Sequence, residues 1–234
     1  MKLFTFPYAF GTDAAYNELT SKLASHFNVE NINYPGHGKR IQENFLFSIE
    51  ELAQDAIEII KKSNEDYALL GYSLGARVCC EIMRQLQETS YRKPKHVFLL
   101  ASEPPSIKPD LTQNSNMTIE EAKDLLYEMG NTPKEIIESE EIMAFIHPMM
   151  QADTKVLENS YRAKWPYEQL DIPLTVINGH DDEDLLEAEK AWQTFFPVDT
   201  DLERLRFDGG HFFLFENEEN LVKLKNIILD KLVK

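Results

Sequence analysis

The chain has 234 residues, of which 43% are hydrophobic and 27% charged, a composition typical of a globular protein with a sizeable core. Its 40 acidic and 24 basic side chains leave a net charge of −16, which repels phosphate backbones and anionic lipid, so neither nucleic acid nor a membrane surface is an expected partner. The first residues contain no signal-peptide segment, and no apolar run could span a bilayer. The adjacent Cys79 and Cys80 could form only a strained bridge, so we expect reduced thiols. Together these points predict a cytoplasmic location.

Short apolar runs alternate with helical patterns along the chain. The predicted strands are 3–6, 29–34, 67–70, 97–101, 173–178 and 203–207. The predicted helices are 13–26, 48–62, 76–89, 185–195 and 217–232, in which apolar side chains recur on one face. This alternation predicts a single α/β domain over residues 1–234, with a mostly parallel sheet covered by helices on both faces.

The segment 104–166 interrupts this alternation, because it contains no convincing strand. Helices are predicted near 118–129, where Thr118 and Glu121 have the spacing of a capping box, from Pro133 and near Glu140. A helical insertion of this size between two strands is expected to cover the active-site edge of the sheet as a lid. An additional helical layer without a gating role is the alternative.

The sequence Gly71-Tyr72-Ser73-Leu74-Gly75 matches the G-x-S-x-G pattern of a nucleophile elbow. In that turn a serine stands between a strand and a helix, and small residues two positions away let strand and helix pass closely. The pattern alone also fits an ordinary turn, but here a predicted strand precedes it and a predicted helix follows it. Ser73 is therefore the candidate nucleophile.

A serine hydroxyl needs a base within hydrogen-bond reach, and His211 is the candidate among six histidines. It follows the last predicted strand and the pair Gly209-Gly210, which lets a loop approach the serine closely. The other five are expected elsewhere: His26 and His96 flank predicted elements at the surface, His147 lies in the helical insertion, and His37 and His180 lie in turns.

The acid of the expected triad should follow a strand between the serine and the histidine. Strand 173–178 is followed by Gly179-His180-Asp181-Asp182, and Asp182 is our candidate, with Asp181 as its competitor. This acidic cluster, which continues through Glu183 and Asp184, could instead be a solvated turn and a helix N-cap. The order Ser73, Asp182, His211 is that of the α/β-hydrolase fold, which we therefore predict for this chain.

An oxyanion hole requires two backbone amides. The amide of Leu74 should supply one, and the loop after the first strand should supply the other, with Ala9 as the first candidate and Phe10 as the next. A plain turn is the alternative interpretation of that loop.

Six segments resemble the type II thioesterases that accompany nonribosomal peptide and polyketide synthases. Three lie around the predicted triad: residues 6–9 resemble the family's Pro-Tyr-Ala-Gly-Gly loop, 71–75 its elbow and 208–214 its Gly-Gly-His-Phe-Phe-Leu segment. Residues 34–40 resemble its Leu-Pro-Gly-Arg/His-Gly-Arg segment, and 126–133 and 149–153 resemble its Gly-Gly-Thr-Pro and Leu-Arg-Ala-Asp segments in the insertion. Phe10 and Asn131 stand where the family has glycine.

The resemblance implies a serine thioesterase that hydrolyses acyl thioesters on the phosphopantetheine arm of carrier proteins, editing stalled or mis-primed synthases. It implies no metal and no bound cofactor, since phosphopantetheine belongs to the substrate. We also expect a monomer. Docking of an acidic carrier would then use a local patch such as Lys39, Arg40, Arg77 or Arg84, or mainly apolar contacts. A general acyl-CoA thioesterase or carboxylesterase, and a non-catalytic interaction module of a synthetase, are the alternatives.

Overall fold

A parallel sheet organises the chain in the computed structural model, which describes residues 1–130, 132–182 and 188–233. The sheet has six strands in the order β2-β1-β3-β4-β5-β6, and every neighbouring pair is parallel. The strands are β1 (Lys2–Phe6), β2 (Asn28–Asn31), β3 (Tyr67–Tyr72), β4 (Val97–Leu100), β5 (Leu174–Gly179) and β6 (Leu202–Phe207). All six predicted strands are confirmed, although β2 ends three residues earlier than expected.

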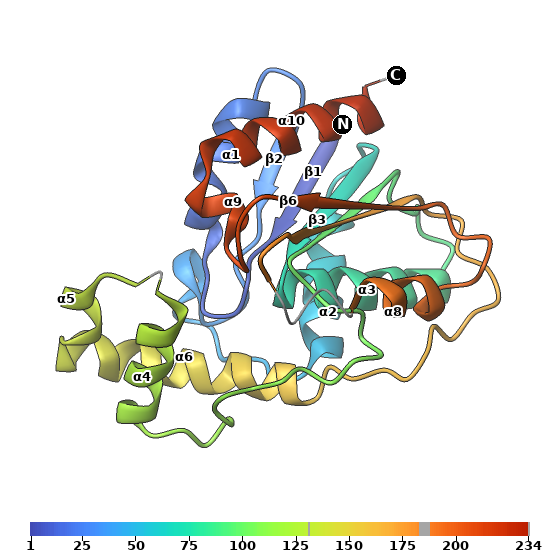
Figure 1. Cartoon of the computed structure of the whole chain (residues 1–234). Coiled ribbons are helices and arrows are strands. Elements are labelled where there is room, and N and C mark those ends of the chain that lie inside the picture. The colour runs from blue at the N-terminus through green and yellow to red at the C-terminus, as the bar shows by residue number, and fades with distance from the viewer. Residues whose placement is uncertain (131, 183–187, 234) are drawn as a thin grey trace.

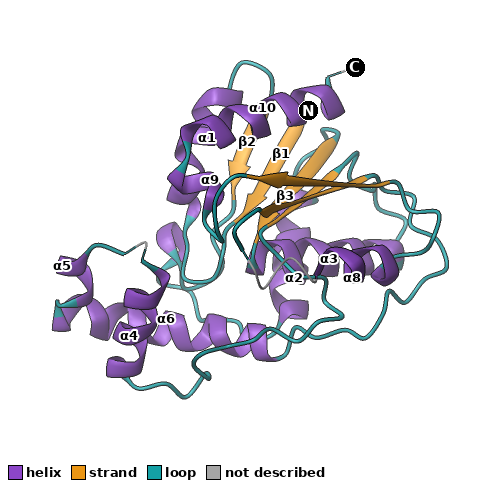
Figure 2. Cartoon of the chain, viewed as in Figure 1, coloured by secondary structure: helices purple, strands orange, loops and turns teal. Residues whose placement is uncertain are grey.

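Helices cover both faces of this sheet (Figures 1 and 2). One layer contains α2 (Ile49–Ile60), α3 (Leu74–Gln87) and α8 (Ala188–Phe195), and the other contains α1 (Asn17–Leu23), α9 (Phe213–Glu216) and α10 (Glu218–Leu232). Because successive side chains of a strand point to opposite faces, β4 serves both layers: Val97 and Leu99 pack with α2 and α3, whereas Phe98 and Leu100 pack with α1 and α10. The predicted fold class is therefore confirmed.

Three helices lie between β4 and β5 in sequence and project from one side of the sheet (Figure 1). They are α4 (Ile119–Met129), α5 (Lys134–Ile137) and α6 (Glu140–Glu158), and the described residues of 104–166 include no strand. Thr118 and Glu121 form the predicted capping box at the start of α4. The three helices share a small apolar core of their own, which includes Leu126, Ile137 and Met143. Asn131 lies outside the described residues.

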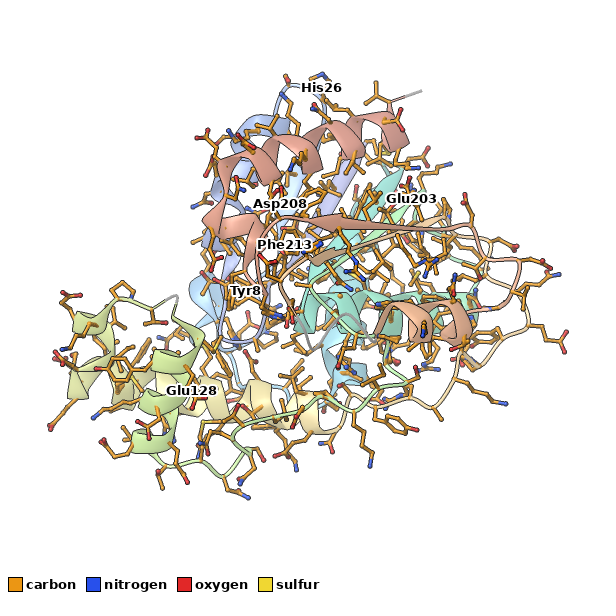
Figure 3. The ribbon with its side chains drawn as sticks, viewed as in Figure 1. Tyr8, His26, Glu128, Glu203, Asp208 and Phe213 are labelled. Atoms are coloured by element: carbon orange, nitrogen blue, oxygen red, sulfur yellow. The ribbon has the colours of Figure 1, made fainter. Side chains whose placement is uncertain are left out.

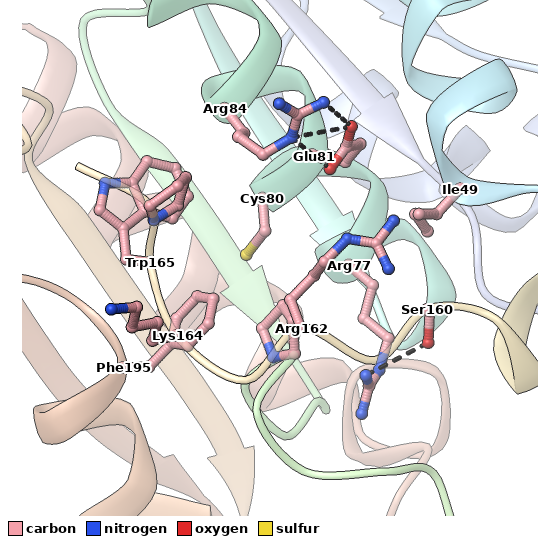
Figure 4. A pocket seen from close by; sticks show the side chains of 12 residues that line it. Ile49, Arg77, Cys80, Glu81, Arg84, Ser160, Arg162, Lys164, Trp165 and Phe195 are labelled. Atoms are coloured by element: carbon pink, nitrogen blue, oxygen red, sulfur yellow. Dashed lines mark hydrogen bonds and ion pairs between the residues drawn. The ribbon is translucent and has the colours of Figure 1, made fainter.

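Arg77, on α3, ties both ends of this helical segment to the body of the protein. Its guanidinium donates to the Ser160 hydroxyl at 3.2 Å (Figure 4). It also donates to the carbonyl oxygen of Ile107 at 3.1 Å. It also forms an ion pair with Glu103 at 3.2 Å, although burial lowers the pKa of the guanidinium. A buried arginine is tolerated only where its donors are satisfied, so these contacts stabilise the two connections of the segment.

The structure differs from the sequence prediction in several details. The predicted helix 13–26 begins as a 3-10 turn, η1 (Asp13–Tyr16), α3 begins at Leu74, and the short helix α9 was not predicted. The prediction of a helix from residue 185 falls partly outside the described residues. His96 was placed at the surface, which is wrong: it is buried, its Nε2 lies 2.8 Å from the Thr175 hydroxyl, and burial lowers its pKa to about 4. No described helix combines the length and the apolar character needed to cross a membrane.

Candidate active site

Ser73 stands at the carboxyl end of β3, where the chain turns into α3. Its φ of +53° lies in the left-handed region, which is costly for a residue with a side chain. The two flanking glycines make the turn possible. A Cβ on Gly71 would lie 2.2 Å from the carbonyl oxygen of Gly75, and a Cβ on Gly75 would lie 2.1 Å from the carbonyl oxygen of Phe6. Strand, helix and the end of β1 therefore meet at distances that only glycine allows.

Replacing Gly75 by alanine is expected to lower the free energy of unfolding by about 3 kcal/mol, because the new methyl group would overlap backbone that cannot move freely. Helix propensity alone would favour alanine by about 1 kcal/mol, so the clash must decide the sign. Gly210→Ala is the matched control, since a Cβ there meets nothing within 4 Å, and it should change stability by less than about 0.5 kcal/mol. Urea unfolding of both variants tests this, and equal stabilities would contradict the packing argument.

The loops after β5 and β6 meet beside this turn. The two strands are paired through Gly179 and Phe207, and the amide of His180 donates to the carbonyl oxygen of Phe207 at 2.7 Å. A Cβ on Gly179 would lie 2.3 Å from the carbonyl oxygen of Gly210, so the loops touch through their backbones. This contact brings residues 180–182 next to His211.

Asp182 and His211 form a hydrogen-bonded pair. The Nδ1 of His211 lies 3.0 Å from Oδ2 of Asp182, whose side chain is 9% exposed. An ionised carboxylate only accepts hydrogen bonds, so Nδ1 carries the proton and Nε2 is left as the basic nitrogen. The side chain of the competitor Asp181 is 71% exposed and contacts His180 instead. The geometry favours Asp182 over Asp181.

Tyr72, the variable residue before the serine, supports the histidine loop. Its hydroxyl donates to the carbonyl oxygen of His211 at 2.5 Å, and its ring packs among Phe212, Phe213 and Phe215. The sequence offered no signal for this contact, because the pattern accepts any residue at that position. Phe213 and Leu214 are buried, as expected for the anchor of the loop (Figure 3 labels Phe213).

A cavity of about 520 Å³ contains Ser73, Asp182 and His211 in its wall. Residues of α4 and α6 complete the wall, among them Leu125, Glu128 and Leu157, so the helical segment contributes one side of the candidate site. A second cavity of about 440 Å³, mostly apolar, lies between α4, α6 and the loop after β1. Figure 3 shows this region, with Tyr8 on the body and Glu128 on α4. The residues lining both cavities are Ala9, Phe10, Met129 and Phe212.

The two candidates for the second oxyanion donor differ in their contacts. The amide of Phe10 donates to Oδ2 of Asp153 at 2.6 Å and is therefore occupied. Ala9 lines the cavity that contains Ser73, and in the described part of the chain neither its amide nor that of Leu74 has a hydrogen-bond acceptor. The geometry favours Ala9 over Phe10.

The remaining histidines do not line this cavity. His26 contacts Ser25, His147 contacts the carbonyl oxygen of Met117, and His180 is largely exposed. His37 is buried and contacts Asp153, a pairing that sequence reasoning missed.

The four cations suggested for carrier docking differ in accessibility. Arg77 is 4% exposed, so its assignment to a docking surface is wrong. Arg40 pairs with Asp55 and Glu43, and Arg84 pairs with Glu81 (Figure 4). The side chain of Lys39 is 83% exposed although it contacts Asp13, so it is the most accessible of the four.

The parallel sheet, the strained serine between strand and helix, and the histidine–aspartate pair in the same cavity define an α/β hydrolase. The family described as Thioesterase domain matches residues 1–231 of the chain. The chain therefore belongs to the thioesterase family, and it is a hydrolase of thioester bonds.

Individual relatives cover almost the whole chain. Linear gramicidin dehydrogenase LgrE of Brevibacillus parabrevis is 29% identical over 228 residues, which cover 95% of this chain and 85% of LgrE. Gramicidin S biosynthesis protein GrsT of Aneurinibacillus migulanus is 26% identical and covers 95% of this chain and 86% of its own length. Among solved structures, the RedJ thioesterase of the prodiginine biosynthetic pathway in Streptomyces coelicolor is 25% identical, with a TM-score of 0.83 over 99% of this chain and 90% of RedJ. The resemblance indicated by the motifs is confirmed.

Proposed function

We propose that this protein is a type II thioesterase that releases acyl groups from the phosphopantetheine arm of carrier proteins during nonribosomal peptide or polyketide synthesis. The pairing of Asp182 with His211 in the cavity that contains Ser73 is the observation that carries the proposal. Membership of the thioesterase family supports the hydrolysis of a thioester. Relatives named for gramicidin S and prodiginine biosynthesis support a role beside a peptide or polyketide synthase.

In the proposed reaction the Oγ of Ser73 attacks the thioester carbonyl carbon while its proton passes to Nε2 of His211. The amides of Ala9 and Leu74 stabilise the oxyanion, and Asp182 stabilises the imidazolium. The carbon–sulfur bond breaks, and the thiol leaves with the proton from His211. A thiol with a pKa of about 8.5 is a good leaving group, so this protonation is less demanding than in peptide hydrolysis. Water then gives a proton to His211, attacks the acyl ester and releases the carboxylic acid, and Ser73 regains its proton.

We propose that the helical segment 104–166 acts as a lid over this site. It supplies one wall of the cavity with Ser73 and half of the residues that line the apolar cavity next to it, which suits an acyl chain. Tyr127 and Phe145 of this segment are 47% and 63% exposed, and Phe145 also lines the apolar cavity, which favours apolar contacts with a carrier over an extended cationic surface.

The name of LgrE suggests dehydrogenase activity as a second candidate function, but the sequence contains no dinucleotide-binding pattern that would support it. The nine glycines of the chain do not form the G-x-G-x-x-G pattern with which a Rossmann fold binds a dinucleotide. Hydrolysis remains the reaction that Ser73, His211 and Asp182 can perform.

Turnover of one acyl group on three carriers tests the proposed substrate: a carrier protein, coenzyme A and free pantetheine, with a simple aryl ester for comparison. We expect kcat/KM to be highest for the acyl carrier, because protein contacts add to those made by the shared arm. Acyl-pantetheine is the matched control for those contacts. A kcat/KM for the carrier below that for the aryl ester would contradict the proposal and favour a general esterase.

A further inference from the structure

A buried carboxylate of the lid segment contacts the candidate oxyanion loop. Asp153, on α6, is 2% exposed. Its Oδ2 accepts the amide of Phe10 at 2.6 Å and lies 3.1 Å from Nε2 of His37, which belongs to the loop after β2. One oxygen atom therefore joins three segments that lie far apart in the sequence.

The hydrogen bonds of His37 indicate that its ring is charged. Nδ1 lies 3.0 Å from the carbonyl oxygen of Pro35, which can only accept, and Nε2 faces the carboxylate of Asp153. Facing an ionised Asp153, both ring nitrogens donate, which corresponds to the imidazolium form. Burial disfavours this charge, but the hydrogen bond that His37 donates to Asp153 and the negative charge of Asp153 outweigh burial and raise the pKa of His37. The pair lies 2% and 3% exposed, so it is a buried ion pair.

Phe10 occupies a backbone conformation that needs support. The amide of Gly11 donates to the carbonyl oxygen of Tyr8 at 3.0 Å, so residues 8–11 form a turn. The φ of Phe10 at its third position is +69°, as in a type II turn, where glycine is the preferred residue. The more common type I turn would have a negative φ at this position and would turn the peptide between Ala9 and Phe10 over. The short bond to Asp153 holds that peptide in the observed orientation.

We propose that Asp153, with His37 as its partner, is a positioning residue that holds the turn of residues 8–11 in its oxyanion-binding conformation. This inference rests on the proposed function, in which the amide of Ala9 is an oxyanion donor. Ala9 is the second residue of the turn and borders the peptide that Asp153 holds. Because Asp153 belongs to α6, the oxyanion hole is complete only while this helix packs on the body of the protein.

Two substitutions separate the hydrogen bond from the charge. In Asp153→Leu the acceptor for the Phe10 amide is lost. In Asp153→Asn the side-chain oxygen in the place of Oδ2 can still accept from the Phe10 amide and from an N–H at Nε2 of His37, while the negative charge is lost. Glu158→Gln is the control on the same helix, because Glu158 contacts Ser115 rather than the oxyanion loop.

We expect Asp153→Leu to lower kcat for the acyl carrier by about 10²-fold to 10³-fold with little change in KM, the loss typical of one oxyanion donor. Asp153→Asn should stay within about tenfold of the wild type, and Glu158→Gln should be unchanged. A trifluoromethyl ketone analogue, which forms a tetrahedral adduct with the serine, should lose affinity for Asp153→Leu by the same factor as kcat. A non-hydrolysable acyl thioether, which forms no oxyanion, should bind as before.

Equal losses of affinity for the ketone and the thioether would overturn the proposal, because they would indicate a general disturbance of the cavity. Wild-type kcat in Asp153→Leu would also overturn it. If Asp153→Leu does not fold, Asp153→Asn tests the proposal. In that variant the amide proton of Phe10 should shift upfield in the NMR spectrum, and kcat should stay within about tenfold of the wild type. A loss of kcat above about 10²-fold would contradict the proposal. Turnover that persists in Ser73→Ala would instead refute the proposed function, whatever the Asp153 variants do.

Discussion

Replacing Ser73 by alanine is expected to lower kcat for acyl-carrier hydrolysis by about a million-fold, since the variant lacks the hydroxyl proposed to form the acyl-enzyme. A fluorophosphonate probe should label the wild type at this serine and should not label the variant. Circular dichroism and binding of an acyl thioether analogue serve as controls, because alanine removes only an oxygen atom from the cavity wall.

Two results would contradict the role of Ser73. Labelling that persists in Ser73→Ala would place the nucleophile elsewhere. A folded wild-type protein that the probe does not label would favour a non-catalytic interaction module of a synthetase, the alternative that the sequence left open.

Asp182→Asn is expected to lower kcat by about 10⁴-fold at neutral pH. An amide at this position can donate to Nδ1 of His211 and would favour the tautomer whose Nε2 carries the proton, so the base facing the substrate would be lost. The KM for the acyl carrier should change little, because the side chain of Asp182 orients the histidine and does not bind the acyl group. Steady-state kinetics from pH 6 to pH 9 measure the effect.

Asp181→Asn is the matched control for this prediction. The substitution removes the same charge one residue away, but the side chain of Asp181 is 71% exposed and does not contact His211. Its kcat should stay within about threefold of the wild type, as is usual for an exposed surface substitution. A larger loss in Asp181→Asn than in Asp182→Asn would reverse the assignment of the acid.

Several features of the site could be predicted because their signals are local. Gly71 and Gly75 lie two residues before and after Ser73, and the structure shows the backbone contacts that exclude a Cβ at both positions. The strand before Ser73 and the helix after it were readable from apolar runs and periodicity. The capping box of α4 involves only Thr118 and Glu121, three residues apart.

Other features depend on segments that meet only after folding. Asp181 and Asp182 are adjacent and equally acidic, and they differ because the backbone contact between Gly179 and Gly210 decides which one reaches His211. Arg77 resembles a surface cation in sequence, yet the connections of the helical segment 104–166 cover it. The burial of His96 also depends on a segment distant in sequence, because its ring contacts Thr175 of β5.

The sequence by itself determined the order of strands and helices, the elbow and the candidates for the nucleophile and base, because each follows from residues a few positions apart. Only the tertiary structure decided which acid pairs with His211, which amide of the loop after β1 remains free, and that Asp153 meets His37 and Phe10. These outcomes depend on the packing of distant segments, since burial and hydrogen-bond partners are set by neighbours in space and leave no periodic signal along the chain.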